Sequence, residues 1–220
     1  MAQEPFNPLD KLELAESISR AVLRGTSSPL PPPGRQRTGG LASFPGAGIY
    51  AIYYRGVFEP YATLVRQRSD SGELSPIYVG KAIPPGGRPG GMGSLQPTID
   101  PVLWKRLKEH ATSIHEATNL SLEDFECRFL RVDDIWIPLG ENILIEMFHP
   151  VWNKRLGGFG NHAPGSGRDK QKRSPWDTLH PGRGWAGHLP PNELDGPAIL
   201  RALEAGRPVL GDSVEATGDS

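Results

Sequence analysis

The sequence predicts a small mixed α/β (α+β) fold whose core spans residues 44–153 of the 220-residue chain. Two segments, GIYAIYY at 48–54 and PIYVGKA at 76–82, are rich in the tyrosine, isoleucine and valine typical of β-strands. Farther along the chain, two segments with apolar residues at helical spacing enclose a third strand-like segment. The order strand, strand, helix, strand, helix is compatible with one domain built around one core.

The first strand alternates along its whole length. We expect one face to carry Ile49, Ala51 and Tyr53, and the opposite face to carry Tyr50, Ile52 and Tyr54. Residues 55–76, between the two tyrosine-rich strands, form an insert that is long for a hairpin loop. Within this insert the run YATLV favours an additional strand.

The core helices have recognisable boundaries. The first is predicted from Pro101 to Asn119 with Asp100 as its cap, and its apolar stripe consists of Leu103, Leu107, Ala111 and Ile114. The run FECRFLRV at 125–132 is the third predicted strand. The second helix is predicted from Pro138 to Phe148, because Pro150 cannot continue a helix.

The segments outside the core differ from it in composition. Residues 1–43 are predicted to contain a helix from Pro8 to Leu23, capped by Asn7. The following stretch, SSPLPPPGRQRTGG, is expected to form a semi-rigid arm that does not pack as a regular element. Residues 154–188 are predominantly basic among their charged positions. Residues 189–220 are predicted to contain a short helix at 195–205 and a disordered acidic tail.

Composition narrows the class of protein. The 27 glycines and 23 prolines indicate many loops and extended segments. A formal net charge of −1 means that any nucleic-acid-binding surface has to be local. The single cysteine, Cys127, excludes a disulfide framework and a cysteine zinc site, and it is compatible with the cytoplasm, where we expect the protein to act. The sequence shows neither a signal-peptide pattern nor an apolar run of membrane length.

Arg106 and His110 are the first candidates for chemistry, since residues four apart share a helix face. The pair suits a phosphate group, because guanidinium is a permanent cation and imidazole exchanges a proton near neutral pH. Considered alone, a solvated helix face is the commoner explanation of such a pair.

The run LGENILIEMFHPVWN contains two acids, Glu141 and Glu146, and either could hold a hard cation such as Mg²⁺. Glu141 lies near the start of the predicted helix, where the helix dipole favours a carboxylate. Asn153 follows the helix at a proline-marked turn. Taken in isolation, a capping glutamate and a turn asparagine explain the same pattern. Motifs for zinc ligation, a nucleotide-phosphate loop and a serine nucleophile are missing from the sequence.

The order of these parts resembles the GIY-YIG nuclease superfamily. GIY and IYVG are followed by Arg106, Glu141 and Asn153, with YVG standing where the superfamily has YIG. The run ENILIEMFHPVWN is similar to the segment around the metal glutamate in the nuclease domain of a bacterial excision-repair enzyme, and this similarity selects Glu141 over Glu146. The resemblance implies a central three-stranded, mostly antiparallel sheet flanked by helices.

The flanking runs GFGNH and SPWDTLHPGRGWA, with the long insert, resemble one branch of the superfamily, the type II restriction endonucleases that cut CCGCGG. This resemblance implies hydrolysis of DNA phosphodiester bonds with one Mg²⁺ ion per active site, held by Glu141. Tyr50 would be the general base or would orient the water, with His110 taking its proton, and Arg106 would stabilise the charged phosphorane. The remaining catalytic candidates that the resemblance implies are Tyr78, Lys81 and Asn153.

DNA recognition is expected from residues beyond the core. A palindromic target implies a homodimer, and a GC-rich target favours basic side chains that bond guanine in the major groove. The candidates are Asn161, His162, Arg168, Lys170, Lys172, Arg173 and Arg183. We also expect the host to encode a DNA methyltransferase that protects its own sites. The alternatives are a repair or homing-type nuclease and a non-catalytic nucleic-acid-binding protein.

Overall fold

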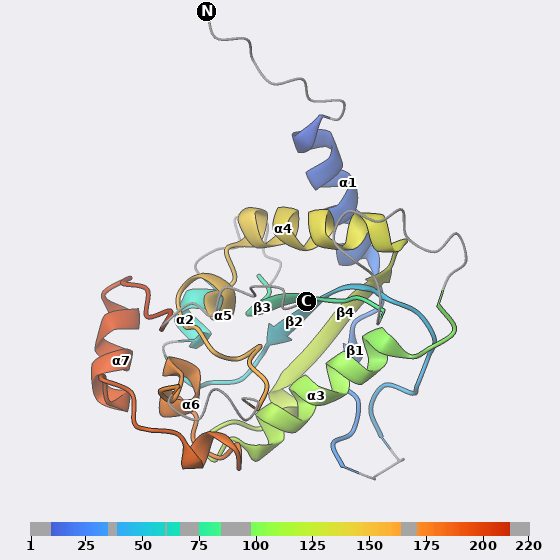
Figure 1. Ribbon diagram of the computed structural model, residues 1–220. Coiled ribbons are helices and arrows are strands. Elements are labelled where there is room, and N and C mark those ends of the chain that lie inside the picture. The colour runs from blue at the N-terminus through green and yellow to red at the C-terminus, as the bar shows by residue number, and fades with distance from the viewer. Residues whose placement is uncertain are drawn as a thin grey trace, which may run out of the picture.

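A single antiparallel sheet forms the centre of the computed structural model, which describes residues 10–34, 39–59, 61–66, 75–84, 98–163 and 171–211. Within these residues the sheet has four strands in the order β1-β4-β2-β3 (Figure 1). The strands are β1 (Ser28–Pro29), β2 (Gly48–Tyr54), β3 (Tyr78–Ala82) and β4 (Phe125–Arg131). Strand β2 pairs with both β3 and β4, and β1 pairs with β4. The three predicted strands are confirmed, and every pairing among the described strands is antiparallel.

The fourth strand comes from the proline-rich segment and corrects the prediction that this segment does not pack as a regular element. Pro29 lies opposite Glu126 of β4. Proline is tolerated there because β1 is an edge strand, where a missing backbone N–H leaves no ladder bond unmade. The next residue, Leu30, is only 3% exposed and belongs to the core.

The two faces of the sheet are covered by different helices. As predicted, Tyr50, Ile52 and Tyr54 pack in one hydrophobic cluster and Ile49, Ala51 and Tyr53 in another. Helix α3 (Val102–Glu116) covers the first face through its predicted apolar stripe. Helices α1 (Lys11–Arg24) and α4 (Ile137–Phe148) cover the opposite face (Figure 1).

Short helices fill the remaining described segments. These are α2 (Tyr61–Arg66), α5 (Val151–Lys154), α6 (Pro175–Leu179) and α7 (Gly196–Glu204), with 3₁₀ turns at Leu122–Asp124, Asp134–Trp136 and Ala186–His188. The prediction of α7 is confirmed, and Asp195 caps it by accepting a hydrogen bond from Ala198 N at 2.8 Å. Helices α5 and α6 were not predicted, because segments of four and five residues are too short for a periodic pattern.

Two further predictions are wrong. The YATLV run forms α2 instead of a strand, and its Tyr61 is buried in the core. Helix α3 has Pro101 at its N-cap with no side-chain cap, so Asp100 does not cap it. The main-chain carbonyl of Asp100 accepts instead from Gly46 N and Val102 N. The predicted start of the first helix at Pro8, its Asn7 cap and the acidic tail from residue 212 lie outside the described residues.

None of the helices in the described part of the chain has the length and apolarity needed to cross a membrane. The thiol of Cys127 is buried in β4, and burial raises its pKa to about 12. A thiol in that state is not reactive, and in this structure it acts as a small apolar core residue.

Candidate active site

Tyr50 and His110 form the centre of the candidate site. The Tyr50 hydroxyl, on β2, lies 2.6 Å from His110 Nε2 on α3, and neither side chain is more than 2% exposed. Burial raises the pKa of Tyr50 well above its usual 10 and lowers the pKa of His110 well below its usual 6.5. Arg106 adds to the lowering of the His110 pKa because a cation opposes a second positive charge. Both side chains are therefore neutral near neutral pH.

Tyr78 completes a cluster of rings on the same face of the sheet. Its ring centroid lies 5.1 Å from that of His110 and 6.3 Å from that of Tyr50. Gly80, between them on β3, leaves space for the Tyr50 hydroxyl, since a Cβ at this position would lie 2.4 Å from it. The GIY and YVG motifs thus lie side by side on neighbouring strands, because Tyr50 of β2 pairs with Gly80 of β3.

Arg106 lies at the mouth of this cluster. Its guanidinium donates to Gly160 O at 3.0 Å and to Glu109 Oε2 at 2.7 Å, and its Nη1 lies 2.6 Å from His162 Nε2. Its positive charge opposes the effect of burial on the pKa of Tyr50 and of Tyr78. Arg106 is therefore placed to favour negative charge on either phenol or on a substrate beside them.

Glu141 and Lys81 form an ion pair, with 2.6 Å between Oε2 and Nζ. The Glu141 side chain is 14% exposed, and its charge raises the pKa of both Tyr50 and Tyr78. Glu146 instead points to solvent and pairs with Lys154. The two acids therefore have different surroundings, and the one whose charge acts on the two tyrosines is Glu141, the acid that the family resemblance selects.

A divalent cation fits this donor set. In the described ranges no group of three or more His, Cys, Asp or Glu side chains could hold a metal ion. Mg²⁺ does not require such a group, because it keeps several waters and binds through one or two carboxylates plus substrate phosphates. Glu141, largely shielded from solvent and beside the tyrosine cluster, satisfies that requirement.

Asn153 braces the edge of the sheet. Its Oδ1 accepts from Val79 N and its Nδ2 donates to Val79 O, both at 2.8 Å. The side-chain amide thus takes the place of a neighbouring strand along β3, between Tyr78 and Gly80. Both polar groups of the Asn153 amide are used in this brace.

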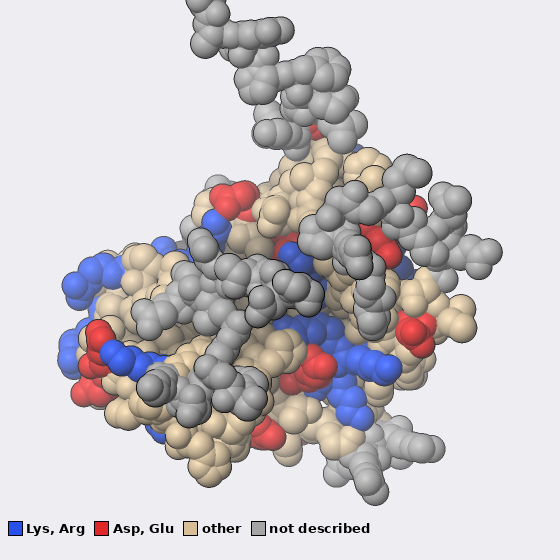
Figure 2. Space-filling model, viewed as in Figure 1, with Lys and Arg blue, Asp and Glu red and all other residues tan. Residues whose placement is uncertain are grey.

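A groove of about 390 Å³ opens beside the site and is lined by Lys81, Lys105, Arg106, Glu109 and His162, among others. Figure 2 shows basic side chains gathered over α3 on this face. Lys105 was not predicted, although its position next to Arg106 on one helix was a signal available in the sequence. Lys108, one turn from Lys105, lies over the Trp104 ring at 5.2 Å and adds to the positive charge of α3.

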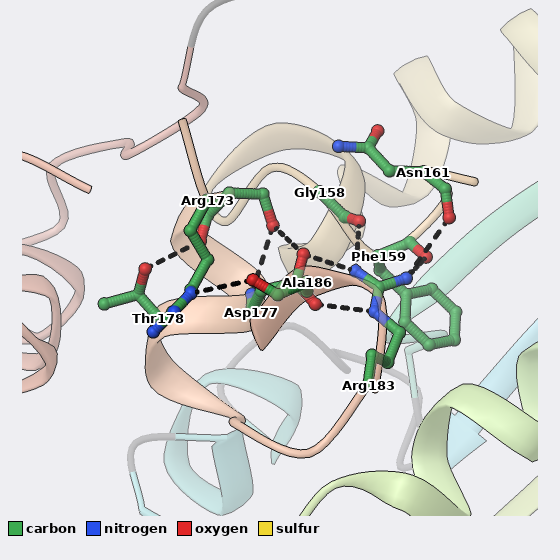
Figure 3. A network of polar contacts seen from close by, with 9 residues as sticks. Gly158, Phe159, Asn161, Arg173, Asp177, Thr178, Arg183 and Ala186 are labelled. Atoms are coloured by element: carbon green, nitrogen blue, oxygen red, sulfur yellow. Dashed lines mark hydrogen bonds and ion pairs between the residues drawn. The ribbon is translucent and has the colours of Figure 1, made fainter. Parts of the chain in front are cut away.

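Arg183 does not lie on the surface, which contradicts its prediction as a DNA contact. It is 2% exposed and pairs with Asp177, with Nε to Oδ1 at 2.6 Å and Nη2 to Oδ2 at 2.7 Å (Figure 3). Its other three N–H groups donate to the carbonyls of Gly158, Phe159 and Asn161. All five donors of this guanidinium are used inside the protein, so none remains for DNA.

The other predicted DNA contacts are divided between two places. Asn161 and His162 are exposed, and together with Arg106 they line a hollow beside the candidate site. Lys172 and Arg173 line a separate hollow of about 400 Å³, together with Asn161. Lys172 pairs with Glu193 at 2.6 Å, and Arg173 donates to two main-chain carbonyls of the turn at 186–188. Arg168 and Lys170 lie outside the described residues.

Comparison with known proteins agrees with this geometry. A family model described as the Eco29kI GIY-YIG domain matches residues 42–205. Among curated proteins no match was found. The matched range contains every candidate catalytic side chain described above, and the restriction enzyme Eco29kI recognises CCGCGG. Nucleases with the GIY-YIG domain generally depend on a divalent metal. The chain therefore belongs to the Eco29kI GIY-YIG family of restriction endonucleases, which hydrolyse phosphodiester bonds in DNA.

Proposed function

We propose that the protein is a type II restriction endonuclease that uses one Mg²⁺ ion per active site to cut both strands of a GC-rich palindrome, CCGCGG or a close relative. The observation that carries the proposal is the buried contact of 2.6 Å between the Tyr50 hydroxyl and His110 Nε2, beside a groove lined by Arg106 and Lys81. A purely DNA-binding protein has no need of a buried proton pathway or of a shielded carboxylate such as Glu141.

Tyr50 needs a proton acceptor to act on water. A phenol titrates near ~10 in water, so an ordinary tyrosine is a poor base at neutral pH, and burial shifts the pKa of Tyr50 farther in this direction. In the tautomer with its proton on Nδ1, His110 accepts the Tyr50 proton through Nε2. Arg106 favours the phenolate that this transfer leaves, because its positive charge lowers the pKa of Tyr50 against the effect of burial.

The other side chains stabilise the charge of the transition state or hold the reacting groups in position. Arg106 and Lys81 stabilise the negative charge that grows on the phosphorane. Tyr78 donates a hydrogen bond to the attacking water or to a phosphate oxygen. Glu141 would hold the Mg²⁺ ion, and the ion would supply Lewis-acid catalysis at the phosphate. Asn153 acts on the reaction only by bracing β3, in agreement with its two contacts to Val79.

DNA recognition involves the extension at 154–188, and the proline-rich arm after α1 and the insert after Tyr54 are the segments proposed to wrap DNA or to form the dimer. A two-fold dimer would place one active site on each strand of a palindrome. The proposed base or phosphate contacts are Asn161, His162, Arg168, Lys170, Lys172 and Arg173, together with Lys105 and Lys108 of α3. The enzyme would act in the cytoplasm, where Cys127 stays reduced.

Cleavage of plasmid DNA tests the proposal. Purified protein with Mg²⁺ should produce discrete fragments from a plasmid containing CCGCGG, with ends that map to this sequence. A matched plasmid with CCGCGG changed to CCATGG at each site is the control. Nicking only at damaged bases, or a shift of DNA mobility without cleavage, would contradict the proposal. The protein should also sediment as a dimer on a duplex with one site, and a monomer on that duplex would overturn the dimer.

A further inference from the structure

Four successive main-chain carbonyls, from Gly158 to Asn161, each accept a hydrogen bond from an arginine. Arg183 donates to Gly158 O at 2.9 Å, to Phe159 O at 3.1 Å and to Asn161 O at 3.2 Å. The remaining carbonyl, that of Gly160, accepts from Arg106 at 3.0 Å. One loop is thus shared between a buried guanidinium and the guanidinium at the active site.

The same loop contacts two further catalytic side chains. The Phe159 ring stacks on His110, with centroids 4.6 Å apart and an interplanar angle of 20°. It also meets the Tyr78 ring edge-on at 4.9 Å. Gly160 lies so close to Tyr78 that a Cβ there would be 2.8 Å from the hydroxyl. The loop therefore forms one wall of the site, and its position affects Arg106, His110 and Tyr78 together.

Arg183 is itself held from several sides. Asp177 neutralises its charge through two hydrogen-bonded contacts (Figure 3). The guanidinium also lies over the rings of Trp176 and Trp185, at 4.6 and 4.7 Å from their centroids. Ser174 in turn donates to Asp177 Oδ2 at 2.6 Å. Buried ion pairs of this kind are weak contributors to stability compared with well-packed apolar residues. A requirement for a fixed loop geometry explains such a pair better than a requirement for stability.

We propose that Arg183 is a positioning residue for phosphodiester cleavage, which holds residues 158–161 in the conformation that orients Arg106, His110 and Tyr78. The inference rests on the proposed cleavage reaction and adds to it a residue that touches neither substrate nor metal. Lysine cannot replace Arg183, because an ammonium group has three donors on one atom and cannot span three carbonyls and a carboxylate. The loop would lose its position while the buried charge of Asp177 stayed paired.

The test compares Arg183→Lys with Tyr61→Phe. Tyr61 is a matched control, because its hydroxyl makes a buried contact of 2.6 Å with His180 Nε2 that involves no residue of the loop. We expect Arg183→Lys to lower the single-turnover rate at saturating DNA about 100-fold, as displaced catalytic groups do. The dissociation constant for DNA, measured in Ca²⁺, should change less than about threefold, since Arg183 has no donor for DNA. Tyr61→Phe should lower the melting temperature and leave the rate within about twofold, because the site keeps its geometry.

Amide hydrogen exchange gives a second measurement that needs no activity. Exchange at residues 158–162 should accelerate in Arg183→Lys and stay unchanged in Tyr61→Phe. A wild-type rate in Arg183→Lys would overturn the inference, and so would a rate loss of the same size in both variants at the same loss of stability.

If Arg183→Lys does not fold, Asp177→Asn is used, with the expected result a faster loop exchange and a rate at least about tenfold lower. An unchanged rate or unchanged exchange in that variant overturns the inference. Failure of the wild type to cut would refute the proposed function, and the exchange measurement would still show whether Arg183 holds the loop.

Discussion

The hydroxyl of Tyr50 contacts Nε2 of His110 at 2.6 Å, with both side chains removed from solvent. The contact joins a β2 residue to an α3 residue, and burial keeps each group neutral by moving the two pKa values apart. Nε2 of the neutral His110 therefore already lies within hydrogen-bond distance of the Tyr50 hydroxyl and can accept its proton. In the proposed mechanism, deprotonation of Tyr50 would be a local transfer within this preformed pair.

Tyr50→Phe removes the proton that this pair transfers. We expect the cleavage rate to fall by about 10³-fold or more, since general base catalysis contributes 10²–10⁴-fold and the positioning of water is lost as well. DNA binding, measured by gel shift, should change little. Tyr53→Phe is the matched control, because Tyr53 lies on the same strand but packs on the opposite face of the sheet. Equal rates for Tyr50→Phe and wild type would exclude Tyr50 from the chemistry.

Glu141→Ala should abolish cleavage at every Mg²⁺ concentration, because the proposed ion loses its protein carboxylate. Removal of the metal from wild type with EDTA should have the same effect, and added Mg²⁺ should restore cleavage. Glu146→Ala tests the distinction between the two acids, since Glu146 is exposed and pairs with Lys154 on the surface. This control should cut normally. Normal cleavage by Glu141→Ala would contradict the proposal that Glu141 binds the Mg²⁺ ion.

Asn153→Asp should destabilise the protein by about 1–3 kcal/mol, because a carboxylate loses the donor to Val79 O and faces that carbonyl with a negative charge. The melting temperature in a thermal scan measures this loss. Asn161→Asp makes the same chemical change at an exposed side chain and should alter the melting temperature little. A similar shift in both variants would show that the brace on β3 does not matter.

His180 makes stability dependent on pH. Burial lowers its pKa from 6.5 to about 3, while the unfolded chain takes up the proton near 6.5. Between these values the unfolded state binds more protons, so stability falls as the pH falls, by up to about 1.4 kcal/mol per pH unit. The loss should begin below about pH 6.5.

His180→Gln removes this contribution, and its unfolding free energy in urea should therefore fall less steeply than that of wild type between about pH 6 and pH 4.5. His188→Gln, at an exposed histidine, is the control. Slopes equal to wild type in both variants would contradict the prediction.

Local patterns in the sequence determined much of the fold. Alternation along GIYAIYY assigned Tyr50 and Tyr53 to opposite faces, and the spacing of apolar residues identified the buried stripe of α3. Both succeeded because the geometry of a strand or helix alone decides which side chains share a face. The strand predicted at YATLV was wrong, because a segment as short as the six-residue α2 has a weak intrinsic preference that packing around Tyr61 overrides.

The sequence by itself determined which residue types stand in the order of a GIY-YIG nuclease, and hence the family and the candidate chemistry. The tertiary structure decided what the charged and polar side chains do. In the folded protein, Asn153 hydrogen-bonds both main-chain groups of Val79, and Glu141 lies close enough to act on the tyrosines. Arg183 is buried and donates to the carbonyls of the loop at 158–161. The physical reason is that an arginine or asparagine is equally compatible with a surface and with a buried network. The difference lies in the carbonyls and carboxylates that distant segments bring to it, and only the folded chain brings them together.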